Sequence, residues 1–239
     1  MNTIKLNRED TKIIAHKGLS GLEPENTMAS FIAAGNRSYF GIETDMHRTS
    51  DGEFVIIHDD TTERVAEEKL DVEKTTLHEL RNLLLKDKNG VISRTDLRIP
   101  TLQEYITTCQ NYDKKCILEL KNKFNQKEIE KIVGIAKSMD YLNQIIFISF
   151  DLDNLKILRK LLPGQELQLI TGRYSSNIKE VLLANELDLD IEFNSLTKDI
   201  IEDLHQCGRK INCWTCDKKE EAEKLIAYGV DYLTTNILE

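Results

Sequence analysis

Short apolar runs recur along the chain, separated by longer stretches in which apolar residues follow a helical period. Eight such runs occur, at residues 13–16, 41–46, 116–121, 145–150, 167–171, 189–194, 210–214 and 231–234. A short apolar run with polar flanks is typical of a strand that is buried on both faces. The alternation therefore predicts parallel strands joined by crossover helices.

The stretches between these runs predict helices at residues 27–37, 102–110, 126–139, 152–161, 177–185, 197–207 and 218–228. Eight strand-and-helix units in 239 residues favour an α/β fold of the (β/α)8 TIM-barrel class over an open, doubly wound sheet. The chain has only 3 Pro and no Ser/Gly-rich tract that could act as a linker. We therefore expect residues 1–239 to form a single TIM-barrel domain.

A further apolar run, residues 54–58, follows the second predicted strand too closely for a parallel crossover, which needs about a dozen residues. It should turn back as a β-hairpin, because Asp51 and Gly52 tolerate the positive φ angles of a tight turn. Counting outward from a turn that pairs Thr49 with Gly52, the hairpin pairs Glu43 with His58. The sequence thus predicts a small β-hairpin excursion after the second strand of the barrel.

Acidic residues interrupt two predicted strands at alternate positions. Glu43 and Asp45 share a face of the second strand with His47, and Glu119 shares a face of the third with Lys121. Buried carboxylates repel one another and lose hydration unless a positive charge lies between them. Solvated or ion-paired acids at the barrel rim are the simpler alternative. Three acids in inward phase favour a divalent cation, and all-oxygen ligands indicate Mg²⁺ or Ca²⁺.

Two histidines should lie at the same mouth of the barrel as these acids. His16 ends the first strand, and His58 lies where the hairpin returns. Catalytic groups of such barrels collect at the carboxyl ends of the strands. Histidine titrates near neutral pH, so two imidazoles beside a metal-bound phosphate can share the removal and delivery of protons.

The overall charge limits the classes of partner. A formal net charge of −9 without a basic stripe argues against binding to nucleic acid or to an anionic lipid surface. No apolar run approaches the roughly 18 residues of a membrane-spanning helix, and the opening residues MNTIKLNREDTK contain no apolar signal segment. We therefore expect a cytoplasmic protein. The sequence does not define its oligomeric state.

The 5 Cys fit that compartment, because an odd number cannot form a complete set of disulfides. Cys213 and Cys216 have the spacing of a redox or zinc site, but they lie in an apolar, strand-like run and not at the start of a helix. Buried strand cysteines are the simpler interpretation.

The chain also carries a series of short motifs in a defined order. They are IAHKG at 14–18, PENT at 24–27, E-x-D at 43–45, DG at 51–52, HD at 58–59, IPTL at 99–102, ILELK at 117–121, SF at 149–150, WT at 214–215 and GVDYLTT at 229–235. In order and spacing these motifs resemble the glycerophosphodiester phosphodiesterase family, one of the phosphatidylinositol phospholipase C-like TIM-barrel phosphodiesterases. The resemblance covers almost the whole chain, and the joint order is more specific than any single block.

This resemblance implies a metal-dependent TIM-barrel enzyme that hydrolyses glycerophosphodiesters to glycerol 3-phosphate and an alcohol. By position, the metal ligands are expected to be Glu43, Asp45 and Glu119, and the general acid/base pair His16 and His58. The expected substrate contacts are Lys17, Lys121 and Trp214. Plain core packing is the alternative for Trp214.

Two segments depart from the family pattern. Lys17 stands where the family usually has Arg, and an ammonium does not reproduce the bidentate grip of a guanidinium on phosphate, so phosphate affinity or substrate choice is expected to differ. Residues 235–238 (TNIL) stand where the family tends to have Asp and then Pro, which is expected to alter the last loop without touching the catalytic groups. In the PENT motif, Asn26 or Thr27 is expected to cap the first helix, with an added role in the pocket as the alternative.

The chemical outcome is left open by the sequence. Water could attack the phosphorus directly, or a glycerol hydroxyl could attack first and release a cyclic phosphate. A third hypothesis, prompted by Lys17, is a non-catalytic barrel that binds a phosphorylated metabolite, although binding alone does not require the pair formed by His16 and His58.

Overall fold

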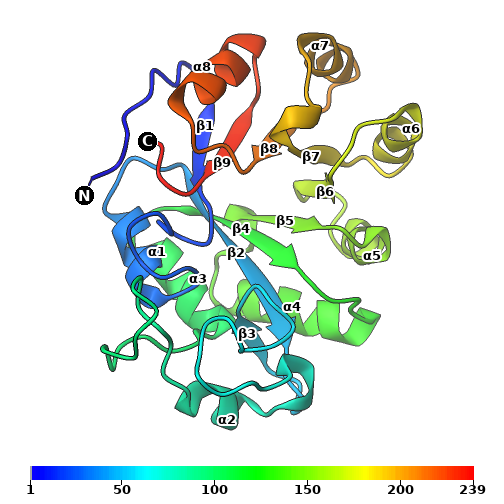
Figure 1. Cartoon of the computed structure of the whole chain (residues 1–239). Coiled ribbons are helices and arrows are strands. Elements are labelled where there is room, and N and C mark those ends of the chain that lie inside the picture. Colours follow the sequence, from blue (N-terminus) through cyan, green and yellow to red (C-terminus); the bar gives the residue numbers. More distant parts are fainter. Residues whose placement is uncertain (1) are drawn as a thin grey trace.

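Parallel strands form the centre of the molecule, and helices surround them. The computed structural model describes residues 2–239, and Figure 1 shows the strands converging on a common centre. The parallel strands are β1 (Lys12–Ala15), β2 (Gly41–Arg48), β4 (Lys115–Leu120), β5 (Ile145–Ser149), β6 (Leu167–Thr171), β7 (Asp188–Glu192), β8 (Ile211–Trp214) and β9 (Tyr232–Thr235).

These eight strands close into a ring. Their order is β1-β9-β8-β7-β6-β5-β4-β2, and β2 pairs in turn with β1, where Ile14 lies opposite Gly41. Every pairing within the ring is parallel. The predicted TIM barrel is therefore confirmed, and all eight predicted strands form part of it.

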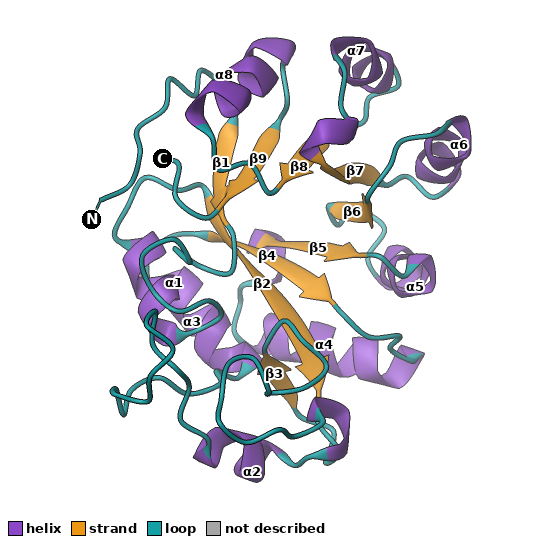
Figure 2. Cartoon of the chain, in the orientation of Figure 1, coloured by secondary structure: helices purple, strands orange, loops and turns teal. Residues whose placement is uncertain are grey.

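The helices lie outside the ring (Figure 2). They are α1 (Met28–Gly35), α2 (Leu77–Asn82), α3 (Leu102–Asn111), α4 (Gln126–Ser138), α5 (Leu152–Leu161), α6 (Ser176–Ala184), α7 (Lys198–Gln206) and α8 (Lys219–Tyr228). Several begin with a capping box, in which an N-cap side chain and the side chain three residues later satisfy each other's backbone N–H groups. In α1 this pair is Thr27 and Ser30, so Thr27 and not Asn26 is the cap. Short 3-10 turns add Val72–Lys74, Leu142–Gln144 and Phe193–Ser195.

The extra strand, β3 (Phe54–Ile56), pairs antiparallel with β2 outside the ring, as predicted, but its register differs by one residue. Met46 lies opposite Ile56, so the turn contains three residues, 50–52, and not two. The N–H of Gly52 donates to the carbonyl of Thr49 at 3.0 Å, and Gly52 has a φ of 77°. A left-handed residue at the end of a three-residue loop is what this turn type requires.

The predicted pairing of Glu43 with His58 is therefore wrong. The N–H of Ile57 donates to the carbonyl of Asp45 at 3.0 Å, and His58 lies in the loop beyond the paired segment. The segment from there to α3 holds α2, and apolar residues of this segment such as Leu80 form a second cluster together with Val55 of β3. No helical period in the sequence predicted α2, because this segment is short and mostly irregular.

The barrel interior is apolar at one end and polar at the other. Ile14, Ile117, Ile146 and Tyr232 belong to a buried cluster inside the ring. Glu43 lies beside Ile117 in the pairing of β2 with β4, and the paired residues Asp45 and Glu119 lie two positions nearer the carboxyl ends of these strands. The main core packs between the outer face of the ring and the helices. The interior apolar cluster thus closes one end of the barrel and leaves the other open for a site.

Cys213 and Cys216 are free thiols that are buried. Burial raises the pKa of both thiols, in Cys216 to about 11. Within residues 2–239, the one group of side chains with metal-ligand geometry contains no cysteine. In the same part of the chain, the helices are all too short or too polar to cross a bilayer.

Candidate active site

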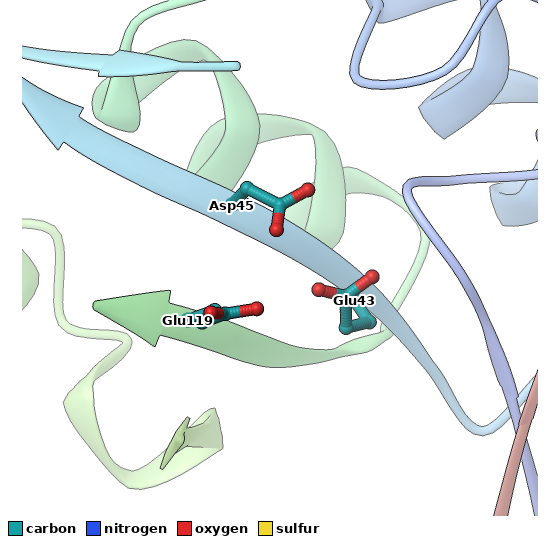
Figure 3. A group of neighbouring side chains, drawn as sticks. All are labelled: Glu43, Asp45 and Glu119. Atoms are coloured by element: carbon teal, nitrogen blue, oxygen red, sulfur yellow. The ribbon is translucent and has the colours of Figure 1, made fainter. Parts of the chain in front are cut away.

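Three carboxylates converge inside the open end of the barrel. Glu43 and Asp45 project from β2 and Glu119 from β4 (Figure 3), and one oxygen of each lies within 4.8 Å of the others. Asp45 and Glu119 are direct neighbours in the parallel pairing of the two strands. All three side chains are buried. The period of two along each strand therefore places these acids as the sequence predicted.

Lys121 places a positive charge beside two of the three acids. Its Nζ lies 3.4 Å from Asp45 and 3.1 Å from Glu119. Burial and the neighbouring carboxylates raise the pKa of Glu43 and of Glu119. Burial alone would also raise the pKa of Asp45, but Lys121 and other nearby cations outweigh it and lower that pKa. One ammonium is thus too little charge to keep three carboxylates ionised.

The donor set fits a hard divalent cation. Three carboxylates against one ammonium would carry two negative charges when fully ionised, which a divalent ion would neutralise. Two of the acids are already held in place: the backbone N–H of Lys17 donates to Glu43 at 2.8 Å, and the Asn26 amide donates to Asp45 at 2.7 Å. Hydrogen bonds that orient ligating side chains in this way are typical of metal sites.

Asn26 holds Asp45 because of an unusual backbone conformation. It has a φ of 53°, a left-handed conformation that asparagine tolerates better than most residues. Its side-chain oxygen accepts a hydrogen bond from Thr44 at 2.7 Å. Of the two expected caps, Thr27 is therefore the one that caps α1, whereas Asn26, in the loop before α1, orients a candidate metal ligand.

His16 follows β1 and faces the site. Its Nδ1 lies 2.8 Å from the side-chain oxygen of Asn236, and its Nε2 lies 3.9 Å from Glu43. Burial lowers the pKa of His16, and the charge of Lys17 lowers it further. The expectation that residues 235–238 leave the catalytic groups untouched is wrong, because Asn236 is the hydrogen-bond partner of His16.

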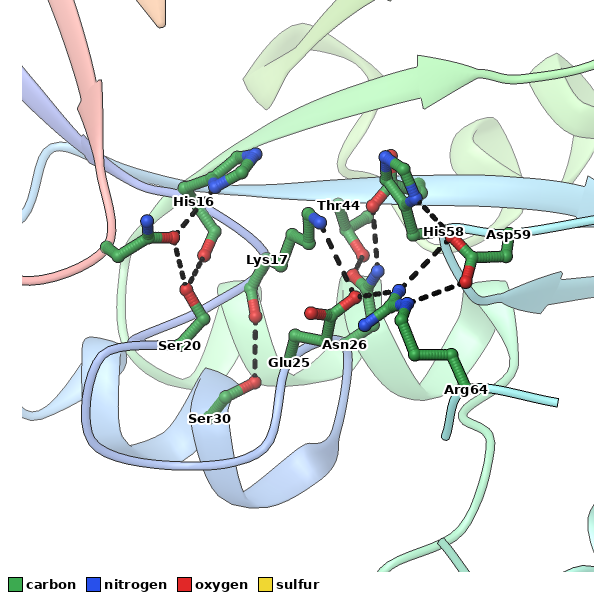
Figure 4. Close-up of polar contacts among 12 residues, drawn as sticks. His16, Lys17, Ser20, Glu25, Asn26, Ser30, Thr44, His58, Asp59 and Arg64 are labelled. Carbon is green, nitrogen blue, oxygen red and sulfur yellow. Dashed lines mark hydrogen bonds and ion pairs between the residues drawn. The ribbon is translucent and has the colours of Figure 1, made fainter. Parts of the chain in front are cut away.

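His58 reaches the same site from the loop after β3 and is held by a chain of charges (Figure 4). Its Nδ1 lies 2.6 Å from Asp59. Arg64 donates to Asp59 at 2.7 Å and to Glu25 at 2.7 Å, and Glu25 lies 3.4 Å from Lys17 Nζ. Arg64 pairs with Asp59 closely enough to lower the pKa of Asp59 to about 2. Asp59 therefore remains ionised beside the imidazole.

His47 supports this loop instead of joining the carboxylates. Its Nε2 lies 3.2 Å from the carbonyl oxygen of His58, so this nitrogen donates its proton to the loop backbone. Burial lowers the pKa of His47. A neutral His47 thus fixes the position of His58 through the main chain.

A cavity of about 120 Å³ connects these groups. Its lining includes the predicted residues Glu43, Glu119, Lys121, His16, His58 and Trp214. Trp214 stands edge-to-face with Phe150, with ring centroids 6.1 Å apart, and Phe150 is exposed. Lys17 does not line the cavity; its ammonium points to Glu25. The other predicted residues are therefore brought together around one cavity, whereas Lys17 lies outside its lining and pairs with Glu25.

The sequence of the chain matches a known protein family. The model of the glycerophosphoryl diester phosphodiesterase family matches residues 16–239. The chain belongs to this family. Its members are phosphoric diester hydrolases, so the predicted family and enzyme class are both confirmed.

Individual members of the family match over nearly their full length. A glycerophosphodiester phosphodiesterase of Caldanaerobacter subterraneus subsp. tengcongensis is 30% identical over 232 residues, which cover 95% of this chain and 94% of that protein. One from Bacillus altitudinis is 27% identical over 236 residues, covering 95% and 94%.

Solved structures of the family agree with the fold. An Oleispira antarctica phosphodiesterase, solved with its product sn-glycerol-3-phosphate, has a TM-score of 0.87 and 28% identity over 94% of this chain and 92% of that one. A glycerophosphodiester phosphodiesterase from Parabacteroides distasonis has a TM-score of 0.80 and 27% identity over 96% and 94%.

Proposed function

We propose that the chain hydrolyses glycerophosphodiesters to glycerol 3-phosphate and an alcohol, with one divalent cation and two histidines as general acid and base. The observation that carries this proposal is the convergence of three buried carboxylates and two histidines on one cavity. The sn-glycerol-3-phosphate product of the Oleispira relative supports the same small-molecule substrate class.

Glu43, Asp45 and Glu119 are the residues that would hold the cation. A bound Mg²⁺ or Ca²⁺ supplies Lewis-acid stabilisation of charge on the phosphoryl oxygens. Lys121 lies beside the same carboxylates and lines the cavity, so its ammonium binds the phosphate as a further positive charge. Trp214 provides an apolar wall against which the substrate packs.

The two histidines divide the proton transfers. The acceptor oxygen of Asn236 and the carboxylate of Asp59 fix the proton on Nδ1 of His16 and of His58, respectively. In each neutral ring, Nε2 is then the nitrogen that accepts or returns a proton in the cavity. Burial lowers the pKa of His16 and so favours its neutral form. We therefore assign the general base to His16 and the general acid to His58.

We expect Lys17 to act on the bound phosphate mainly through its electrostatic potential and not through direct contact. Its ammonium pairs with Glu25 at 3.4 Å, so it contributes positive potential to the mouth more than a direct grip on phosphate. The loss of a guanidinium at this position should raise KM for the diester more than it lowers kcat.

The test is the release of glycerol 3-phosphate from glycerophosphocholine with Mg²⁺ or Ca²⁺. We expect EDTA, His16→Ala and His58→Ala each to abolish it, and His78→Ala, on the exposed face of α2, to leave it unchanged. Activity that survives both site-histidine variants would exclude the acid/base assignment.

Phosphorus NMR of the products separates direct hydrolysis from a route that ends in a cyclic phosphate. Tight binding of diesters without turnover would favour a non-catalytic barrel.

A further inference from the structure

Asp190 is a buried acid of the same cavity that the proposed chemistry does not use. It lies on β7, its side chain is 3% exposed, and it lines the cavity together with His16 and Glu119. It is separate from the carboxylate cluster, which contains only Glu43, Asp45 and Glu119 within residues 2–239.

One carboxyl oxygen of Asp190, Oδ1, is buried without a hydrogen-bond partner among residues 2–239. Its polar neighbours inside the barrel bond to one another instead: Asn212 donates to Gln168 at 3.1 Å, and Thr234 donates to Asn212 at 3.1 Å. An unpaired buried polar group costs about 1–3 kcal/mol. A group retained at that cost beside a cavity indicates a ligand that completes it.

Trp214 offers the complementary group on the adjacent strand. The indole Nε1 of Trp214 is also buried without a partner among the described residues, and Trp214 pairs in register with Glu192, two residues beyond Asp190 on β7. The carboxyl can accept a hydrogen bond, and the indole can only donate one. A hydroxyl group both donates and accepts, so it matches this pair.

The position of β7 in the ring indicates which hydroxyl of the substrate reaches Asp190. In the closed ring, β7 is the fourth strand from β2 in either direction, so Asp190 and the acids of β2 lie on opposite walls. A phosphate held near Glu43 therefore directs the far end of a short substrate toward Asp190. Within the glycerol moiety, the terminal hydroxyl is the group farthest from the phosphorus.

The charge state of Asp190 suits an anionic ligand. Burial raises the pKa of Asp190 well above its usual range, and the nearby Glu119 raises it further. A neutral acid does not repel a phosphodiester and can donate as well as accept a hydrogen bond. The recognition itself does not depend on this state, because the carboxyl accepts from a hydroxyl in either form.

We propose that Asp190, with the indole N–H of Trp214, binds the terminal hydroxyl of the glycerol moiety and so selects glycerol diesters over diesters of shorter or less hydroxylated alcohols. This inference rests on the proposed function, since it assigns the substrate's glycerol end to that site. Asp190 acts on selectivity and not on the proton transfers.

The experiment compares glycerophosphocholine with the matched diester of propane-1,2-diol, which lacks only the terminal hydroxyl and keeps the one next to the phosphoester. We expect wild type to prefer the glycerol diester in kcat/KM by about tenfold or more. Asp190→Leu should reduce this ratio to within about twofold, and Asp190→Asn should keep most of it because an amide still accepts and donates. Thr234→Val is the control in the same cavity and should keep the ratio.

Binding separates failure of this inference from failure of the proposed function. Calorimetry with sn-glycerol 3-phosphate and with propane-1,2-diol 1-phosphate, in Mg²⁺ or Ca²⁺, should give the same pattern of ratios even if neither diester is hydrolysed. Thermal unfolding checks that Asp190→Leu is folded, and its melting temperature should equal or exceed that of wild type, since an unpaired polar group is removed. Equal discrimination in wild type and Asp190→Leu, or none in wild type, would overturn the proposal.

Discussion

The side-chain oxygen of Asn236 lies 2.8 Å from Nδ1 of His16. The same oxygen accepts a hydrogen bond from the hydroxyl of Ser20 at 2.6 Å, and the amide nitrogen donates to Asp217 at 2.6 Å. The amide orientation is therefore fixed by donors on one side and a carboxylate on the other. Because the oxygen can only accept, the proton of neutral His16 resides on Nδ1, and Nε2 faces Glu43.

Asn236→Asp should destabilise the protein, although the family tends to have Asp here. The new carboxylate would stand against that of Asp217 and lose the hydrogen bond between them, which should lower the free energy of unfolding by roughly 1–3 kcal/mol. Adding Asp217→Asn exchanges the amide and the carboxylate and should restore most of the loss. Urea unfolding of the two single variants and the double variant gives the coupling energy. An additive double variant would show that the two side chains do not interact.

Arg64 should affect catalysis more than stability. It joins Asp59 to Glu25 beside His58, and an exposed ion pair contributes only about 0–1 kcal/mol to stability. Arg64→Gln should lower kcat/KM about tenfold by loosening the Asp59 that orients His58. Arg94 is the matched control, because it also bridges two acids, Glu23 and Asp96, at 2.7 Å each.

Arg94→Gln should therefore cost a similar small amount of stability and leave kcat/KM within about twofold of wild type. Steady-state kinetics and urea unfolding of both variants separate the two roles. If the variants lose activity equally, Arg64 does not act through His58.

A divalent cation should stabilise the fold. Binding to the native state alone adds about 2.7 kcal/mol at a ligand concentration of one hundred times Kd. Mg²⁺ or Ca²⁺ should thus raise the melting temperature of wild type, and EDTA should reverse the shift. Glu119→Gln should lose most of the shift, yet be no less stable than wild type in EDTA, because burial and Asp45 raise the pKa of Glu119 and already disfavour its ionised form in the folded protein.

Asp190→Asn serves as the control for this measurement, since Asp190 lies in the same cavity but outside the cluster. Its melting temperature should respond to the cation as wild type does. A cation response that persists unchanged in Glu119→Gln would place the ion elsewhere.

The sequence predicted those parts of the site that follow a strand period. Glu43, Asp45 and Glu119 could be placed because side chains alternate along a strand and parallel strands present the same end. The register of the hairpin could not, because Asp51 and Gly52 suit a two-residue and a three-residue turn alike. One residue of difference exchanges the two faces of a strand.

The partners of the histidines were beyond such reasoning. Asn236 meets His16 across 220 positions in the sequence, and this contact exists only because the barrel closes β9 against β1. Arg64 lies in an irregular segment with no period to orient it. Asp190 lies in a predicted buried strand and has no oppositely charged neighbour in the sequence. Because an unpaired acid is rare in a buried strand, this pattern could have marked Asp190 as a candidate site residue.

Glu239 provides a stability test far from the active site. Its side chain is buried and accepts hydrogen bonds from Thr3 at 2.7 Å and Ser38 at 2.8 Å, with Lys5 Nζ at 2.9 Å. Burial alone would raise the pKa of Glu239, but these partners lower it to about 2. The folded pKa is below the unfolded one, so the ionised side chain stabilises the protein above about pH 4.5, and this stabilisation is lost as the pH falls toward 2.

Glu239→Gln should therefore lower the free energy of unfolding by about 2 kcal/mol at pH 7, because the charge-assisted hydrogen bonds are lost. The difference from wild type should shrink as the pH is lowered from about 4.5, since wild type then loses the same charge. Urea unfolding at a series of pH values measures this difference, with Glu67→Gln on the exposed surface as control. A difference that stays constant down to the lowest pH would mean that the charge of Glu239 contributes nothing and that only the shape of the side chain matters.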